Sequence, residues 1–192
     1  MNGDDVELRV LGCLIEKQRT TPDAYPLSLN SLRLACNQTT NREPVVDYDE
    51  QTIRAALDRL SNRGWVRLAS GPGSRAVKFR HLFDEALGLS GAQISVLAVL
   101  MLRGAQTPGE LKQRSERLHA FASLPEVEET LGELIERELV MRLPRQPGQK
   151  EQRYAHRLGS EEEVIAAPAV SLEDRVAQLE VQMAELLERL AP

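Results

Sequence analysis

The 192-residue chain is poor in the residues that build stacking surfaces and disulfide frameworks. Aromatic residues make up 4% of the sequence, so few large rings are available to stack on bases or to line a ligand cage. The two cysteines, Cys13 and Cys36, each lie among apolar residues in a helical pattern. Two cysteines are too few for a disulfide scaffold, so we expect both to be buried, reduced thiols.

Long apolar runs are also missing. No stretch of about 18 apolar residues is present to cross a membrane. The N-terminal sequence lacks the basic segment and long apolar run of a secretory signal. We therefore predict a cytoplasmic protein with no membrane partner.

Motifs of the common catalytic and cofactor sites do not occur. There is no nucleophile elbow, Walker lysine motif or kinase signature, and the GPGS stretch at 71–74 lies between two predicted strands, where a hairpin turn is expected. The histidines, His81, His119 and His156, do not have zinc-ligand spacing with each other or with the cysteines. We predict no enzyme activity, no cofactor and no metal site.

The net charge of −5 is unevenly distributed along the chain. Residues 6–82 hold 12 Lys and Arg against 8 Asp and Glu, and residues 83–158 hold 10 against 11. Residues 159–192 hold 2 against 8. A generally cationic coat for nucleic acid is therefore excluded, but the first part of the chain is mildly basic.

Residues 6–82 show three amphipathic helical segments followed by two short strands. Apolar residues recur at helical spacing over 6–17, 29–38 and 50–63, and Ser28 and Asp49 are suited to cap the second and third helices. The segments on either side of the GPGS turn are typical of strands. Three helices followed by a β-hairpin are typical of a winged helix, which is a helix-turn-helix unit with an added wing.

The same pattern returns in residues 84–158. Thr107 and Glu110 form a capping box with Pro at the first helical position, and Ser123 and Glu126 have the same spacing. At a shift of 74 residues, five apolar positions of the first unit recur in the second as Val127, Leu131, Leu134, Leu139 and Val140. We predict a mainly α (α+β) fold with two tandem winged-helix domains, at 6–82 and 84–158.

The chain ends in a short linker and a heptad segment. Residues 159–170 are expected to be a flexible linker, and residues 171–190 a coiled-coil-like helix. Its spacing of 4, 3, 4, 3, 4 follows an a/d seam, made by Leu172, Val176, Leu179, Met183, Leu186 and Leu190. A homodimeric coiled coil, a helix packed back on the protein's own domains and a frayed helix all fit this segment, because fewer than three heptads are marginal alone.

Three segments resemble the signature segments of the YceH family: CLIEKQRTTPDAYPLSLNSLRLACNQTTNREPV, MLRGAQTPGEL and PGQKEQRYAHRL. The resemblance covers almost the whole chain, including the heptad tail. It implies a bacterial cytoplasmic protein with two winged-helix domains, and it supplies no catalytic residue. The family pattern has Lys where this chain has Thr39, which removes a cation from the turn before the third helix.

The predicted third helices of the two domains differ in charge. The first carries Gln, Arg and Asn on its outer face, residue types that read base edges or pair with phosphate. In the second, the outer face is acidic, with Glu128, Glu129, Glu133 and Glu136. Phosphates would repel this second helix, so we do not expect it to read DNA.

Two functions follow from these patterns. The first is DNA binding, as in a transcriptional regulator, through the third helix and wing of the first domain. The residues predicted to contact double-stranded DNA are Gln51, Arg54, Arg59, Asn62, Arg63, Arg75, Lys78 and Arg80. The second domain and tail would then serve dimerisation or bind a protein partner through the acidic face. The alternative is a protein–protein adaptor that uses winged helices without touching DNA.

Removing residues 171–192 is expected to convert a dimer into a monomer, because the heptad seam would be lost. Light scattering on the full-length and shortened chains at micromolar concentration measures this. A full-length chain that is already monomeric would contradict the coiled-coil dimer.

Overall fold

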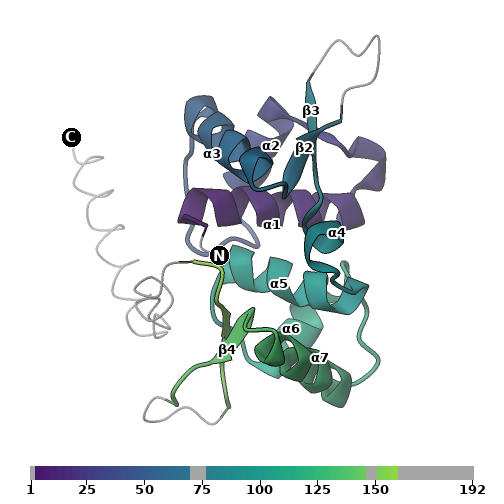
Figure 1. The fold of residues 1–192 in the computed structure, drawn as a ribbon. Coiled ribbons are helices and arrows are strands. Elements are labelled where there is room, and N and C mark those ends of the chain that lie inside the picture. Colours follow the sequence, from purple (N-terminus) through teal and green to yellow (C-terminus); the bar gives the residue numbers. More distant parts are fainter. Residues whose placement is uncertain (1–2, 70–76, 146–150, 160–192) are drawn as a thin grey trace, which may run out of the picture.

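The structure, a computed structural model, describes residues 3–69, 77–145 and 151–159. Within them the chain is an α+β fold, mostly helical, with two small antiparallel sheets (Figure 1). The predicted GPGS turn, Arg75, the linker and the heptad helix lie outside the described residues. None of the described helices has the length and apolar character that a membrane crossing requires.

The first half follows the predicted order, with one short strand that the sequence analysis did not predict. Its elements are α1 (Asp5–Thr20), a 3-10 turn (Pro22–Ala24), β1 (Leu27–Ser28), α2 (Leu29–Cys36), α3 (Glu50–Asn62), β2 (Val66–Leu68) and β3 (Lys78–His81). Both predicted helix caps are confirmed. The Ser28 hydroxyl accepts from the Ser31 N–H at 3.2 Å, and the Asp49 carboxylate accepts from the Thr52 N–H at 2.7 Å.

The second half repeats this order after a short connecting helix. Its elements are α4 (Phe83–Leu87), α5 (Gly91–Arg103), α6 (Pro108–Ser115), α7 (Leu124–Glu136), β4 (Val140–Arg142) and β5 (Tyr154–His156). The capping box of Thr107 and Glu110 is confirmed. The second predicted capping box is only partly present. Ser123 caps α7 as predicted, but the Glu126 carboxylate accepts from the Ala122 N–H, at 2.8 Å, and not from the Ser123 N–H.

The strand pairing of the first half recurs in the second half, at nearly the same 74-residue offset as the apolar positions. In the first sheet β3 lies between β1 and β2, with Val66 opposite His81. In the second sheet Val140 lies opposite His156. The place of β1 is taken there by a single bridge from Gln106 to β5. Each half therefore has the order helix, strand or bridge, helix, helix and hairpin.

The turn after α3 and the turn after α7 have the same backbone conformation, although their sequences differ. Gly64 has φ +72° and its N–H donates to the Ser61 carbonyl at 2.9 Å. Glu138 occupies the equivalent place with φ +57°, and its N–H donates to the Ile135 carbonyl at 2.9 Å. Left-handed backbone is tolerated by Gly and costs other residues about 1–2 kcal/mol. The second half therefore carries strain that the first avoids.

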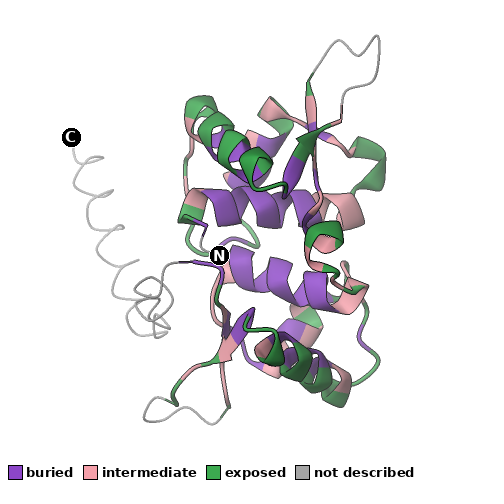
Figure 2. Cartoon of the chain, in the orientation of Figure 1, coloured by how far each residue is buried: buried purple, intermediate pink, exposed green. Residues whose placement is uncertain are grey.

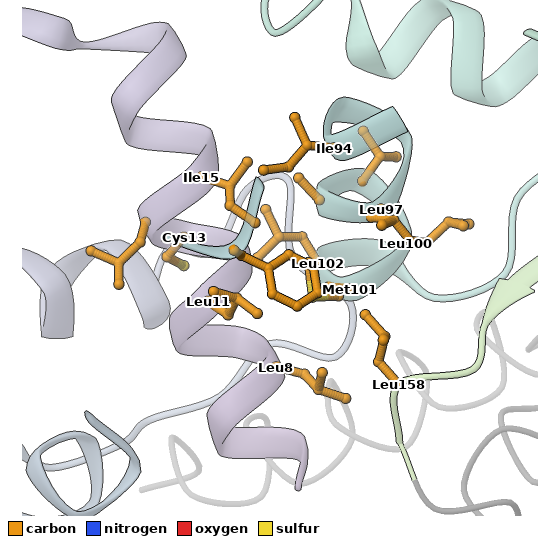
Figure 3. Packing of buried hydrophobic residues seen from close by; sticks show 14 of the residues in the cluster. Leu8, Leu11, Cys13, Ile15, Ile94, Leu97, Leu100, Met101, Leu102 and Leu158 are labelled. Carbon is orange, nitrogen blue, oxygen red and sulfur yellow. The ribbon is translucent and has the colours of Figure 1, made fainter. Parts of the chain in front are cut away.

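A single hydrophobic core spans both halves, with α1 packed against α5 at its centre (Figure 3). Both helices are buried over much of their length (Figure 2). Gly12 permits the close approach: a Cβ built there would lie 2.9 Å from the Leu102 Cγ and 3.4 Å from the Met101 Cβ. The 2.9 Å contact is too short, so a side chain at this position would force Leu102 to shift, whereas the 3.4 Å contact is ordinary packing.

Buried arginines hold the loop that leads from α2 into α3. Arg42 is 4% exposed, and it donates to both carboxylate oxygens of Glu16 on α1, at 3.0 and 2.6 Å, and to the Ala35 carbonyl at 3.1 Å. Arg9, also on α1, donates to the Cys36 carbonyl at 3.2 Å and the Pro44 carbonyl at 2.6 Å. Two of these carbonyls belong to Ala35 and Cys36, buried residues at the end of α2 whose carbonyls have no donor partner within the helix, so the arginines satisfy them.

The same loop touches the second half. The Glu43 N–H donates to the Leu102 carbonyl at 2.8 Å, and Arg103 donates to the Asn41 side chain. At the loop's two ends, the Asn37 side chain donates to the Tyr48 carbonyl at 2.9 Å and accepts from its N–H at 2.9 Å. The NREP part of the signature segment therefore joins α1, the end of α2 and α5.

Substitutions at Gly64 and at Glu138 are expected to change the free energy of unfolding in opposite directions. Gly64→Ala should lower the free energy of unfolding by about 1 kcal/mol, and Glu138→Gly should raise it by about 0.5–1 kcal/mol, because the backbone keeps positive φ at both places. Chemical denaturation measures both. Equal signs for the two variants would contradict the assigned backbone.

Arg42→Met is expected to lower the free energy of unfolding by about 3 kcal/mol, because Glu16 would keep a charge without its main partner. The double variant Glu16→Gln, Arg42→Met should lose less, and Arg33→Met, on the half-buried face of α2, should lie within about 0.5 kcal/mol of wild type. Chemical denaturation compares the three. An Arg42→Met protein as stable as wild type would show that the pair does not hold the loop.

Candidate nucleic-acid interface

Helix α3 presents a polar face outward and an apolar stripe inward. Ile53, Leu57 and Leu60 are almost fully buried in the core. On the opposite side, Gln51, Arg54 and Asn62 are exposed. The outer side of α3 is exposed (Figure 2), and the helical spacing puts Gln51, Arg54 and Asn62 on it together with the acidic Asp58.

Two of the predicted DNA-contacting arginines have carboxylate partners inside the first half. Arg59 lies 2.6 Å from an Asp4 carboxylate oxygen and 3.3 Å from Glu7. Arg63 lies 3.4 Å from Glu7, and its guanidinium stands 5.4 Å from the centre of the Trp65 ring. Glu7 is 1% exposed, so both arginines balance a buried charge.

The partners of these arginines belong to the start of α1. Asp4 and Glu7 form a reciprocal capping box there, with both bonds at 2.8 Å. The spacing of an acidic cap residue and a Glu three residues later is visible in the sequence and was missed. What the sequence could not show is that α3 packs beside this cap, since 52 residues separate Glu7 from Arg59.

Two further predicted residues, Lys78 and Arg80, lie in β3. Arg80 forms an ion pair with Glu85 of α4, and its side chain is 29% exposed. Lys78 is half-buried in β3, opposite Ser28. Among the described residues, no carboxylate lies within ion-pair distance of Arg54. The accessible candidates on α3 are therefore Gln51, Arg54 and Asn62, with Arg54 as the cation.

Helix α7 holds the equivalent place in the second half, on the opposite outer side of the molecule (Figure 1). Glu128, Glu129, Glu133 and Glu136 are all exposed on it. Of these, Glu133 accepts a hydrogen bond from Gln93 at 2.8 Å. The repeated arrangement therefore places an acidic helix where the first half has a polar helix with no net charge.

The histidine at the end of β3, His81, is buried. The His81 Nε2 lies 2.5 Å from the Gln18 side-chain oxygen, and its backbone N–H donates to the Tyr25 hydroxyl at 2.8 Å. Burial lowers the pKa of His81 to about 4 and raises the pKa of Tyr25 to about 12. Both groups are therefore neutral at physiological pH and join β3 to α1 and the 3-10 turn.

Residues suited to bind a metal are not gathered anywhere in the described segments: no three His, Cys, Asp or Glu side chains meet as ligands. Cys13 and Cys36 are both buried free thiols. A hydrogen bond that the Cys36 thiol donates to Cys13, and then burial, raise the pKa of Cys36, which keeps it in the thiol form.

Comparison with known proteins identifies the family. A match to the family described as a protein of unknown function, DUF480, covers residues 4–149. The UPF0502 protein of Geobacter sulfurreducens is 48% identical over 196 residues, covering 95% of this chain and 89% of that protein. The UPF0502 protein of Serratia proteamaculans is 47% identical over 202 residues, covering 95% and 94%.

A third relative, the UPF0502 protein of Opitutus terrae, is 49% identical over 188 residues, which covers 95% of this chain and 82% of that protein. Identity near one half over almost the full length confirms the resemblance drawn from the signature segments. The chain belongs to the DUF480 or UPF0502 family, the family called YceH above.

Proposed function

We propose that the two halves are winged-helix modules and that the first binds double-stranded DNA through α3. The observation that carries this proposal is the exposed face of α3, where Gln51, Arg54 and Asn62 stand on a helix held rigidly by its cap and its buried stripe. Arg pairs with phosphate or guanine, and Gln and Asn offer the paired donor and acceptor that read adenine.

The pairing of the strands supports the winged-helix assignment. In such a unit a short strand after the first helix joins the hairpin that forms the wing, and β1 pairs with β3 in this way. Gln106 and Tyr154 make the corresponding bridge in the second half. The wing would lie beside the third helix, so Lys78 would lie next to the phosphate backbone, while Arg80 would add less charge because it is paired with Glu85.

Arg59 and Arg63 have a different part in this proposal. Because they balance Asp4 and Glu7, they supply less net positive charge to a duplex than their number suggests. We infer that they orient α3 against α1. DNA contact would then rest on Arg54 and the wing, with the second half and the tail left to dimerise or to bind a protein partner.

A protein–protein adaptor is the second candidate. It is favoured by the exposed carboxylates of α7, which suit a basic partner surface and oppose DNA. The two functions are compatible in one chain, because α3 and α7 lie on opposite outer sides (Figure 1).

Binding of a random-sequence duplex to the full-length protein, followed by fluorescence anisotropy across a salt series, tests the DNA proposal. We expect affinity that falls steeply with salt, and Arg54→Ala should lower the slope by about one unit, since one phosphate contact is lost. Glu128→Ala is the matched control, because it changes the equivalent position of α7.

The Glu128→Ala protein should bind the duplex as wild type does. Absence of binding by the wild-type protein at low salt would refute the DNA function and leave the adaptor. An unchanged slope for Arg54→Ala, in a protein that does bind, would show that α3 is not the contact surface.

A further inference from the structure

A polar cleft lies between the two halves, away from the exposed face of α3. Its volume is about 670 Å³, and its walls come from the C-terminal part of α1, the loop before α3, the end of α5 and the C-terminal part of α6 with the residues after it. This volume is in the range of small-molecule sites in proteins. Neither half forms the cleft without the other.

Cations dominate the lining. Lys17, Arg103, Arg114 and Arg117 face the cleft, against one carboxylate, Glu16. Glu16 already accepts two hydrogen bonds from the buried Arg42 guanidinium, which lowers its free charge. The cleft therefore keeps an excess of positive charge from both halves.

Helix ends account for only part of this excess. The C-terminal ends of α1, α5 and α6 approach the cleft. The negative end of a helix dipole stabilises nearby cations, so some of these side chains balance the helix ends. Each end is worth about half a negative charge. Lys17 also lies 3.5 Å from Glu16, and Arg114 lies 3.4 Å from Glu110, which is outside the lining. Even with both carboxylates counted against Arg42 and the four lining cations, the excess of positive charge is larger than three helix ends supply, so an anion would meet a net positive site.

The arginines are crowded against one another. Burial, and then the charge of Arg114, lower the pKa of Arg103. Among the described residues, one hydrogen bond engages the Arg103 guanidinium, to Asn41. Its other N–H groups have capacity for an acceptor. Glu110 balances part of the Arg114 charge, at 3.4 Å, and an anion between Arg103 and Arg114 would reduce the repulsion that remains.

The rest of the lining narrows the ligand class. Gln38, Thr40 and Gln113 add side-chain donors, and the apolar part is small, made by Val99, Leu102 and Leu118. Arginine forks and hydroxyl donors suit phosphate oxygens. Among the described residues that line this cleft none is aromatic, so they offer a nucleotide base no ring on which to stack.

We propose that this cleft binds a small phosphorylated anion without an aromatic base, such as pyrophosphate or a phosphorylated sugar. The ligand would bridge the halves, with Lys17 on one side and Arg103, Arg114 and Arg117 on the other. It would bind independently of DNA, since α3 lies outside the cleft lining.

Calorimetric titration of the full-length protein with pyrophosphate, at constant ionic strength set by potassium chloride, tests the proposal. We expect saturable binding and a rise in melting temperature with ligand concentration. The variant Lys17→Gln, Arg117→Gln should weaken pyrophosphate affinity at least about tenfold. Arg54→Gln is the matched control and should bind pyrophosphate as wild type does.

Four outcomes would overturn the proposal. The first is that the wild-type protein does not bind pyrophosphate, and the second is that the Lys17→Gln, Arg117→Gln protein binds it with wild-type affinity and an unchanged melting profile. The third is that Arg54→Gln weakens pyrophosphate binding equally. The fourth is that the Lys17→Gln, Arg117→Gln protein loses affinity for duplex DNA while no pyrophosphate binding is seen. The last result would assign the cleft to nucleic acid instead. Loss of DNA binding in Arg54→Ala alone concerns α3 and leaves the cleft unaffected.

Discussion

The packing of α1 against α5 is the contact on which the rest of the structure depends. Residues 93–102 of α5 are all buried, so this helix has no face suited to water and must be enclosed by both halves. Gly12 lets α1 approach within the reach of Leu102 and Met101. The two repeats therefore share one core, and their separation would expose the apolar faces of both helices.

Two further features follow from this contact. The loop between α2 and α3 is held between Arg9, Arg42 and the end of α5, so the orientation of α3 depends on the joint between the halves. The basic cleft arises where the C-terminal parts of α1, α5 and α6 converge. A ligand there and a partner on α3 would both act on a scaffold whose rigidity comes from the shared core.

The two halves share their backbone arrangement and differ at the surface. The hairpin register and the turn after the third helix coincide in the two halves, down to the positive φ of Gly64 and Glu138. The outer faces differ, with Arg54 on α3 and Glu128 at the matching place on α7. Core positions are constrained by packing, whereas exposed positions are free to serve different partners.

The sequence by itself determined six of the helices, the two hairpins and their repeated order. It also determined the apolar stripe of α3 and the helix caps at Ser28, Asp49 and Thr107, because periodicity and caps are local properties. It did not reveal α4, β1 or the pairing of Arg59 and Arg63 with Asp4 and Glu7. These contacts, the burial of Arg42 and the gathering of four cations between the halves join residues far apart in the chain. Only the tertiary structure decided them, since the packing of α1 on α5 sets which distant charges meet and which stay exposed.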